Sequence, residues 1–98
     1  MIRIIYTWNV EPENLEQFIE IWKKTTNKIH DEVKGARGSF MLQNDKDGKE
    51  IKTIARWDSL EDWKKFWHEG NHSQMGSMHD LGERVSVEIF KEVDDFTR

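Results

Sequence analysis

The segment His68-Glu69-Gly70-Asn71-His72 contains two histidines and a glutamate at the spacing used by helical zinc sites. On a continuous helix the two histidines would share one face and could bind Zn²⁺, with the glutamate acting as a base. Gly70 and Asn71 are weak helix formers at the point where such a motif needs a firm helix. The sequence therefore favours a fraying helix end with solvated histidines, and we expect no metal site here.

A second candidate ion site is the run Asp45-Lys46-Asp47-Gly48. Its acidic spacing is like the start of a calcium-binding loop, but such a loop needs further oxygen ligands and a glutamate at its twelfth position. Asp-Gly is also a common hairpin turn, because both residues tolerate the backbone conformations that tight turns require. We therefore expect a turn rather than a calcium site.

Aromatic residues form the third group of candidates. Trp63, Phe66 and Trp67 fall on one face of an expected helix, a pattern that more often forms core than a cofactor site. Trp67 is also a candidate for the wall of a ligand cavity, because ligand pockets are mostly apolar with a few polar groups. The polar candidates for such a wall are Asn9, Arg56, His72 and His79.

The elements that must position these residues follow from hydrophobic periodicity and turn signals. Residues 3–10 are typical of a strand, and the apolar spacing after Pro12 predicts a helix over residues 12–33. Ser59 and Asp62 approximate a capping box at the start of a second helix, whereas residues 72–81 are ambiguous. The remaining expected strands are residues 39–43, 50–57 and 85–91.

The order strand, helix, strand, strand, helix, strand predicts one α+β domain over residues 1–98 with a ferredoxin-like βαββαβ fold. Right-handed crossovers place both helices on one face of a four-stranded antiparallel sheet. The first strand carries apolar side chains on both of its faces, so the open sheet face must be covered as well. A second copy of the chain is the simplest cover, which predicts a homodimer through the open sheet face. The sequence does not decide which face of the first strand meets the helices. Tyr6, Trp8 and Asn9 therefore cannot yet be assigned to the pocket or to the dimer interface.

The composition excludes several classes of function. The net charge is −4, which argues against nucleic acid as a partner, and no apolar stretch approaches the length of a membrane span. The chain has no cysteine and begins directly with a strand-like pattern, so we expect a cytoplasmic protein without disulfides. Five tryptophans and five phenylalanines in 98 residues indicate a dimer interface, a ligand cavity or both.

Several segments together carry a family resemblance. They are Val10-Glu11-Pro12-Glu13 after the first strand, Phe18 and Trp22 in the first helix, the turn from Gly35 to Gly38, and Ala55-Arg56-Trp57-Asp58-Ser59-Leu60-Glu61. Over nearly its whole length the chain resembles the antibiotic biosynthesis monooxygenase family, whose fold is a dimeric α/β barrel. The most specific match is Trp57-Asp58-Ser59, which marks the fold rather than the catalytic centre.

The resemblance implies a homodimer with facing sheets and a small apolar pocket between sheet and helices. Some members oxidise phenolic polyketides with O₂ and no metal or flavin, and others open the haem ring. The haem-degrading branch uses an asparagine on the first strand, a tryptophan on the second helix and a histidine beyond it. The corresponding positions here are Asn9, Trp67 and either His72 or His79.

A cofactor-free oxygenase must make its substrate electron-rich, and a histidine base can do so by removing a phenolic proton. The hypothesis is that His72 or His79 is this base and that Asn9 and Trp67 orient substrate and oxygen. We therefore expect a small cofactor-independent monooxygenase acting on an aromatic or quinol-type molecule. The alternatives are a non-catalytic binder of a small apolar ligand, with haem as the possible cofactor or substrate, and a purely structural dimer.

Overall fold

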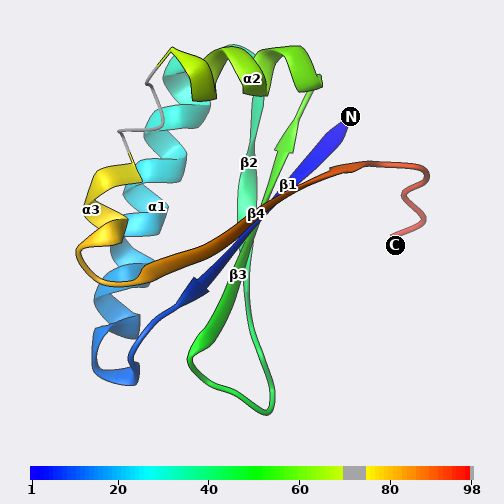
Figure 1. Cartoon of the computed structure of the whole chain (residues 1–98). Coiled ribbons are helices and arrows are strands. Elements are labelled where there is room, and N and C mark those ends of the chain that lie inside the picture. Colours follow the sequence, from blue (N-terminus) through cyan, green and yellow to red (C-terminus); the bar gives the residue numbers. More distant parts are fainter. Residues whose placement is uncertain (70–74, 98) are drawn as a thin grey trace.

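The chain builds a four-stranded antiparallel sheet in the order β2-β3-β1-β4, with its helices on one side, in a computed structural model that describes residues 1–69 and 75–97 (Figure 1). This confirms the α+β ferredoxin-like fold. The strands are β1 (Ile2–Asn9), β2 (Ala36–Gln43), β3 (Glu50–Trp57) and β4 (Glu83–Lys91). The helices are α1 (Leu15–Glu32), α2 (Leu60–His68) and α3 (Gly76–His79). No helix within the described ranges is long and apolar enough to cross a membrane.

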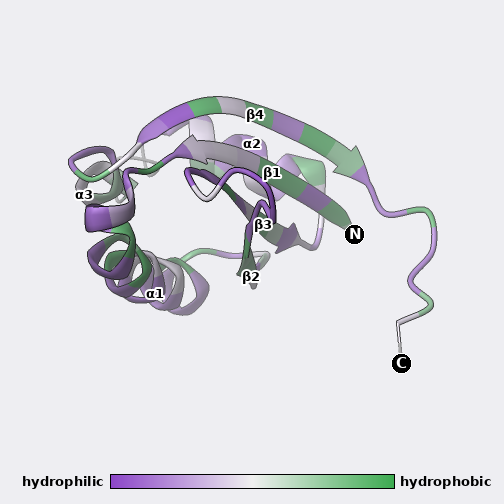
Figure 2. Ribbon diagram, turned by 90° about the horizontal axis from the view of Figure 1, so that it is seen from below, coloured by the Kyte–Doolittle hydropathy of each residue, from purple (hydrophilic) through white to green (hydrophobic). Residues whose placement is uncertain are grey.

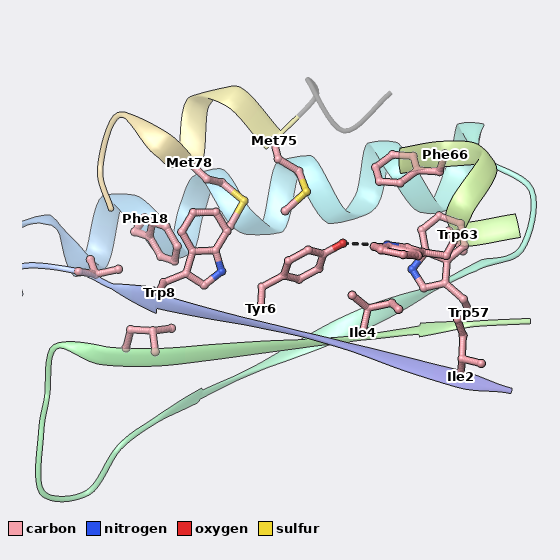
Figure 3. Close-up of a cluster of buried hydrophobic side chains, with 13 residues drawn as sticks. Ile2, Ile4, Tyr6, Trp8, Phe18, Trp57, Trp63, Phe66, Met75 and Met78 are labelled. Atoms are coloured by element: carbon pink, nitrogen blue, oxygen red, sulfur yellow. Dashed lines mark hydrogen bonds between the residues drawn. The ribbon is translucent and has the colours of Figure 1, made fainter. Parts of the chain in front are cut away.

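β1 lies in the middle of the sheet, with one of its faces turned toward the helices. Ile4, Tyr6 and Trp8 point toward the helices and are almost fully buried, whereas Asn9 is exposed on the other face. The sequence left open which face of the first strand meets the helices. The structure shows that Tyr6 and Trp8 lie on the helix side (Figure 3). The register with β4 shifts between Thr7, which pairs with Ser86, and Trp8, which pairs with Arg84.

The first helical segment differs from the single helix expected over residues 12–33. Pro12–Asn14 form a short 3₁₀ turn, α1 begins at Leu15, and Val33 already has an extended backbone. Proline fixes its own backbone angle and has no N–H, so it suits this first turn. Phe18 and Thr25 are buried against the sheet, as expected of the apolar stripe of an amphipathic helix.

The second helix begins where the sequence predicts. The Ser59 hydroxyl accepts a hydrogen bond of 3.1 Å from the Asp62 amide, which satisfies one of the free N–H groups at the start of α2. The helix ends at His68, and the ambiguous segment contains the short helix α3.

The hairpin between β2 and β3 is held by a side chain. The carboxamide oxygen of Asn44 accepts hydrogen bonds from the amides of Lys46 and Asp47, at 2.7 and 3.1 Å. β2 begins at Ala36 rather than at residue 39, because Ala36 pairs with Trp57 before the register shifts. Gly35 and Gly38 flank this start with φ of +87° and +93°, which only glycine adopts without strain. β1 and β4 likewise begin one and two residues earlier than expected.

Candidate functional site

A small cavity lies between the helix-facing side of the sheet and helix α1. Its volume is about 50 Å³, and residues of β1, β2, β3, α1, α2 and α3 line it. A water molecule needs roughly 10–15 Å³ measured in this way, so the space suits a few waters or a few non-hydrogen atoms of a ligand. The cavity is partly open to solvent, and its exposed lining is mostly apolar.

Tyr6 provides a buried hydroxyl in the cavity wall. It is 4 % exposed, and its oxygen accepts a hydrogen bond of 3.1 Å from the indole nitrogen Nε1 of Trp63 (Figure 3). Burial raises the pKa of Tyr6 to about 12, although the Trp63 hydrogen bond and the Arg84 charge act in the opposite direction. The phenol therefore keeps its proton at any physiological pH and is available as a hydrogen-bond donor rather than as a base.

Two further hydroxyls in the same wall also accept from indoles. Nε1 of Trp8 donates to Oγ1 of Thr53 at 3.3 Å, and Nε1 of Trp22 donates to Oγ of Ser39 at 3.4 Å. Thr53 is 2 % exposed and is among the few buried polar residues. Buried indole N–H groups need partners, and the sheet supplies them on the face that the cavity uses.

Trp67 stands in an aromatic group beside the cavity rather than in its lining. Its ring stacks on Trp63 at 5.4 Å between centroids and lies 6.2 Å from the ring of Tyr6. The guanidinium of Arg84 lies 4.9 Å from the Trp67 ring centroid, within the range of a cation–π contact. Trp67 can therefore influence the cavity through Tyr6 and Trp63.

Asn9 and His79 meet in a separate surface depression at the end of β1, which Arg84 also lines. The His79 ring lies 5.3 Å from the Trp8 ring, so Trp8 separates this depression from Thr53 and the cavity. The structure thus brings Asn9 and His79 together and places Trp67 apart from them. His72, the other candidate base, lies outside the described residues.

The other sequence candidates are Arg56 and His68. Arg56 contributes to the cavity wall: its Nη2 donates to Oε2 of Glu92 at 3.2 Å, whereas its buried Nε has no hydrogen-bond partner among the described residues. His68 is exposed at the end of α2, before the second histidine of the zinc-like motif, which the described ranges do not include. No group of three His, Cys, Asp or Glu side chains within residues 1–69 and 75–97 could hold a metal ion.

Sequence reasoning missed the residues that give the cavity its polarity. Ser39 and Thr53 were expected only as strand residues, Tyr6 was left unassigned between pocket and interface, and His30, at the rim of the cavity, was not singled out. A signal was available, because a chain rich in buried tryptophan must supply an acceptor for each buried indole N–H. The identity of those acceptors depends on strand register, which the sequence alone leaves open.

A sequence model of the antibiotic biosynthesis monooxygenase family matches residues 1–76. No curated protein matches the sequence. Among solved structures, the haem degrader MhuD of Mycobacterium tuberculosis is similar with a TM-score of 0.80 at 13% identity, over 99% of this chain and 100% of that chain. The cofactor-independent oxygenase SnoaB of Streptomyces nogalater has a TM-score of 0.77 at 12% identity, over 99% and 97%. A conserved Bacteroides thetaiotaomicron protein of unknown function has a TM-score of 0.70 at 22% identity, over 91% and 94%. At these identities the likeness shows the fold alone.

Proposed function

The chain belongs to the antibiotic biosynthesis monooxygenase family, and on this premise we propose that it is a small cofactor-independent monooxygenase of phenolic or quinol-type molecules. The observation that carries the proposal is the apolar, aromatic-walled cavity with a few fixed hydroxyls. Such a combination is typical of small-molecule sites, where apolar walls hold a ring and a few polar groups orient it. SnoaB, described as a cofactor-independent oxygenase, shares the fold.

The reaction needs an electron-rich substrate and a way to remove protons from it. For an anthrone-type phenol, one oxygen atom of O₂ forms the new carbonyl at the methylene carbon. The second oxygen atom leaves as water with the two hydrogens of that carbon. The atoms and electrons therefore balance without an added reductant.

We assign the roles within this proposal to Asn9, Trp67, His72 and His79. The positions of Asn9 and His79 support the assignment least directly, because both residues line the outer depression and not the cavity. Trp67 supports it most directly, because its ring lies beside Tyr6 and Trp63. Replacing Trp67 by phenylalanine should therefore lower turnover more than replacing His79 by glutamine. If replacing both His72 and His79 leaves turnover unchanged, the histidine-base mechanism is refuted.

The test is oxygen uptake with dithranol, a tricyclic anthrone, in air-saturated buffer containing EDTA. Protein-dependent formation of the quinone, absent with heat-denatured protein, is the expected result. Because the cavity measures only about 50 Å³, a tricyclic substrate must keep most of its rings outside it or displace the wall. Met75 and Met78 are the flexible side chains in that wall, so we expect them to move. Absence of oxidation would refute the proposal for this class of substrate.

One observation favours a second candidate, a small-ligand-binding protein without catalysis. Within the described residues, the cavity lining contains no carboxylate, and its one histidine, His30, lies at the rim with an exposed side chain. Such a binder would show saturable quenching of tryptophan fluorescence without turnover. The small volume argues against haem as the ligand, because a haem would exceed it many times over.

We further propose that the partner is a second copy of the chain, which covers the open sheet face. Phe40, Leu42 and Phe90 are 46 to 50 % exposed there, on the face opposite to the helices. The β4 ribbon is hydrophilic at its start and hydrophobic near its end, where Phe90 lies (Figure 2). Phe40→Lys should shift the molecular mass in light scattering toward the monomer, whereas an unchanged mass would argue against this interface.

A further inference from the structure

The segment that follows β4, residues 92–97, is held firmly where it leaves the sheet, and we call it the arm. The Glu92 amide donates to the carbonyl oxygen of Met1 at 3.1 Å. The Glu92 carboxylate accepts hydrogen bonds from Nε of Arg3 at 2.9 Å and from Nη2 of Arg56 at 3.2 Å. Hydrogen bonds between charged partners are stronger than those between neutral ones. These contacts fix the direction in which the arm leaves β4.

The far part of the arm is folded as well. Both the amide and the hydroxyl of Thr97 donate to Oδ1 of Asp95, at 3.1 and 2.6 Å. Oδ2 of Asp95 lies 3.9 Å from Nη2 of Arg3. Arg3 is on the open face of the sheet, because its neighbours along β1 are buried on the helix side. The carboxylates of Glu92 and Asp95 are therefore both turned toward the arm's own sheet.

The apolar side chains of the arm are turned to solvent instead. Val93 is 95 % exposed and Phe96 is 76 % exposed, which makes them the most exposed large hydrophobic residues that the structure describes. Figures 1 and 2 show the arm leaving the sheet on the side away from α1. An arm that packed only on its own chain would bury these two side chains and expose its acids. The observed pattern is the reverse, which indicates a surface for another molecule.

The open sheet face offers an apolar surface on the same side of the molecule. Phe40, Leu42 and Phe90 remain half exposed there, although the arm of the same chain leaves the sheet on that side. One chain thus carries two exposed apolar surfaces, the arm and the face. In a two-fold dimer, the surface that one copy offers meets the matching surface of the other, and the reverse contact forms at the same time. Two copies can therefore cover both arms and both faces in one closed assembly.

We propose that the arm packs, through Val93 and Phe96, on the open sheet face of a second copy of the chain. This role rests on the dimer put forward with the proposed function, and it names the segment that holds the two copies together. A few aromatic or large apolar anchors usually contribute most of the affinity of an interface. The firm attachment of the arm at Glu92 lowers the entropy that is lost when the arm is ordered on a partner.

The test is sedimentation equilibrium, which gives the Kd of the dimer for the wild-type protein and for the double variant Val93→Ser/Phe96→Ser. We expect the double variant to dissociate at least about tenfold more readily, as truncation of an anchor residue does. Both side chains are exposed in the single chain, so their replacement should leave its fold intact. Circular dichroism checks the fold of each variant. Phe96→Leu keeps an apolar side chain and should retain most of the wild-type affinity.

A matched control is Ile89→Thr, which also replaces an exposed apolar residue by a polar one. Ile89 is 47 % exposed and pairs with Ile4, so it lies on the helix side of β4, away from the open face. This variant should leave the Kd of the dimer unchanged. An equal weakening in Ile89→Thr and in the arm variant would overturn the role of the arm.

A Kd that is unchanged in Val93→Ser/Phe96→Ser would also overturn this role, as would a wild-type protein that is monomeric at every concentration. If Phe40→Lys separates the copies and the arm variant does not, the open-face interface stands and the arm has no part in it. The monooxygenase proposal is tested separately, by the turnover of dithranol. Turnover by a monomeric protein would leave that proposal standing and remove this one.

Discussion

Tyr6 gives the sharpest physical prediction, because it is the only tyrosine in the chain. Its ordinary pKa is 10.0, and burial raises the pKa in the folded protein to about 12. Below pH 10 both the folded and the unfolded chain carry the phenolic proton, so Tyr6 adds no pH dependence there. Between pH 10 and 12 the unfolded chain loses the proton and the folded chain keeps it. The free energy of unfolding therefore falls as pH rises through this window.

The magnitude follows from the size of the pKa shift. A shift of two pKa units at about 1.36 kcal/mol each corresponds to about 2.7 kcal/mol of stability, most of which is lost by pH 12. Tyr6→Phe removes this alkaline loss. The variant should also be less stable at neutral pH by about 1–3 kcal/mol, because Nε1 of Trp63 loses its acceptor. The stability curves of the two proteins should therefore converge as pH rises.

The assay combines two measurements. Near-ultraviolet absorbance of tyrosinate reports Tyr6 alone in the native protein, and urea unfolding at several pH values gives the stability curve. Tyr6→Phe controls for lysine titration and for base-induced unfolding. A tyrosinate midpoint near 10 in protein that is still folded, or the same alkaline slope in Tyr6→Phe, would refute the buried phenol and with it the donor role in the cavity.

Two further predictions concern positions that set the fold around the site. Gly35→Ala should destabilise the protein by about 2–5 kcal/mol, since a Cβ there adds a collision with the Asp62 side chain to the strain of positive φ. Gly38→Ala has similar φ but open space, so urea unfolding should show a loss of only about 1 kcal/mol, and an equal loss for both would contradict the clash. Ser59→Ala should cost about 1 kcal/mol in the same assay because the Asp62 amide loses its cap, whereas Ser59→Asp should restore most of the loss.

The order and type of the main elements were predictable because their signals are local. Alternating and helical periodicities give the strands and helices, and Ser59 with Asp62 marks the start of α2. The exact starts of the strands were less predictable. Ala36 joins β2 through its pairing with Trp57, a contact that no local pattern encodes.

The site was harder to predict because its contacts are long-range. Trp8 meets Thr53 across 45 positions, and Trp63 meets Tyr6 across 57 positions. Such pairs depend on strand register and on the face of β1 that turns inward, and both are set by packing of the whole sheet. The sequence therefore drew attention to residues with obvious chemistry, such as Asn9 and His79, whereas the hydroxyls in the cavity look ordinary in isolation.

The central place of β1 has a consequence for how the chain folds. Ile2 pairs with Lys91, and the Arg3 side chain reaches Glu92, 89 positions away. Contacts of such long range slow folding, because the entropy of closing a large loop is lost before the strand pairing can stabilise the chain. During synthesis the apolar first strand must wait until residue 91 has left the ribosome before the sheet can be completed. We therefore expect that a chain shortened within β4 stays unfolded and aggregates. This would happen although α1 and the residues that carry the cavity hydroxyls, Tyr6, Ser39 and Thr53, are still present.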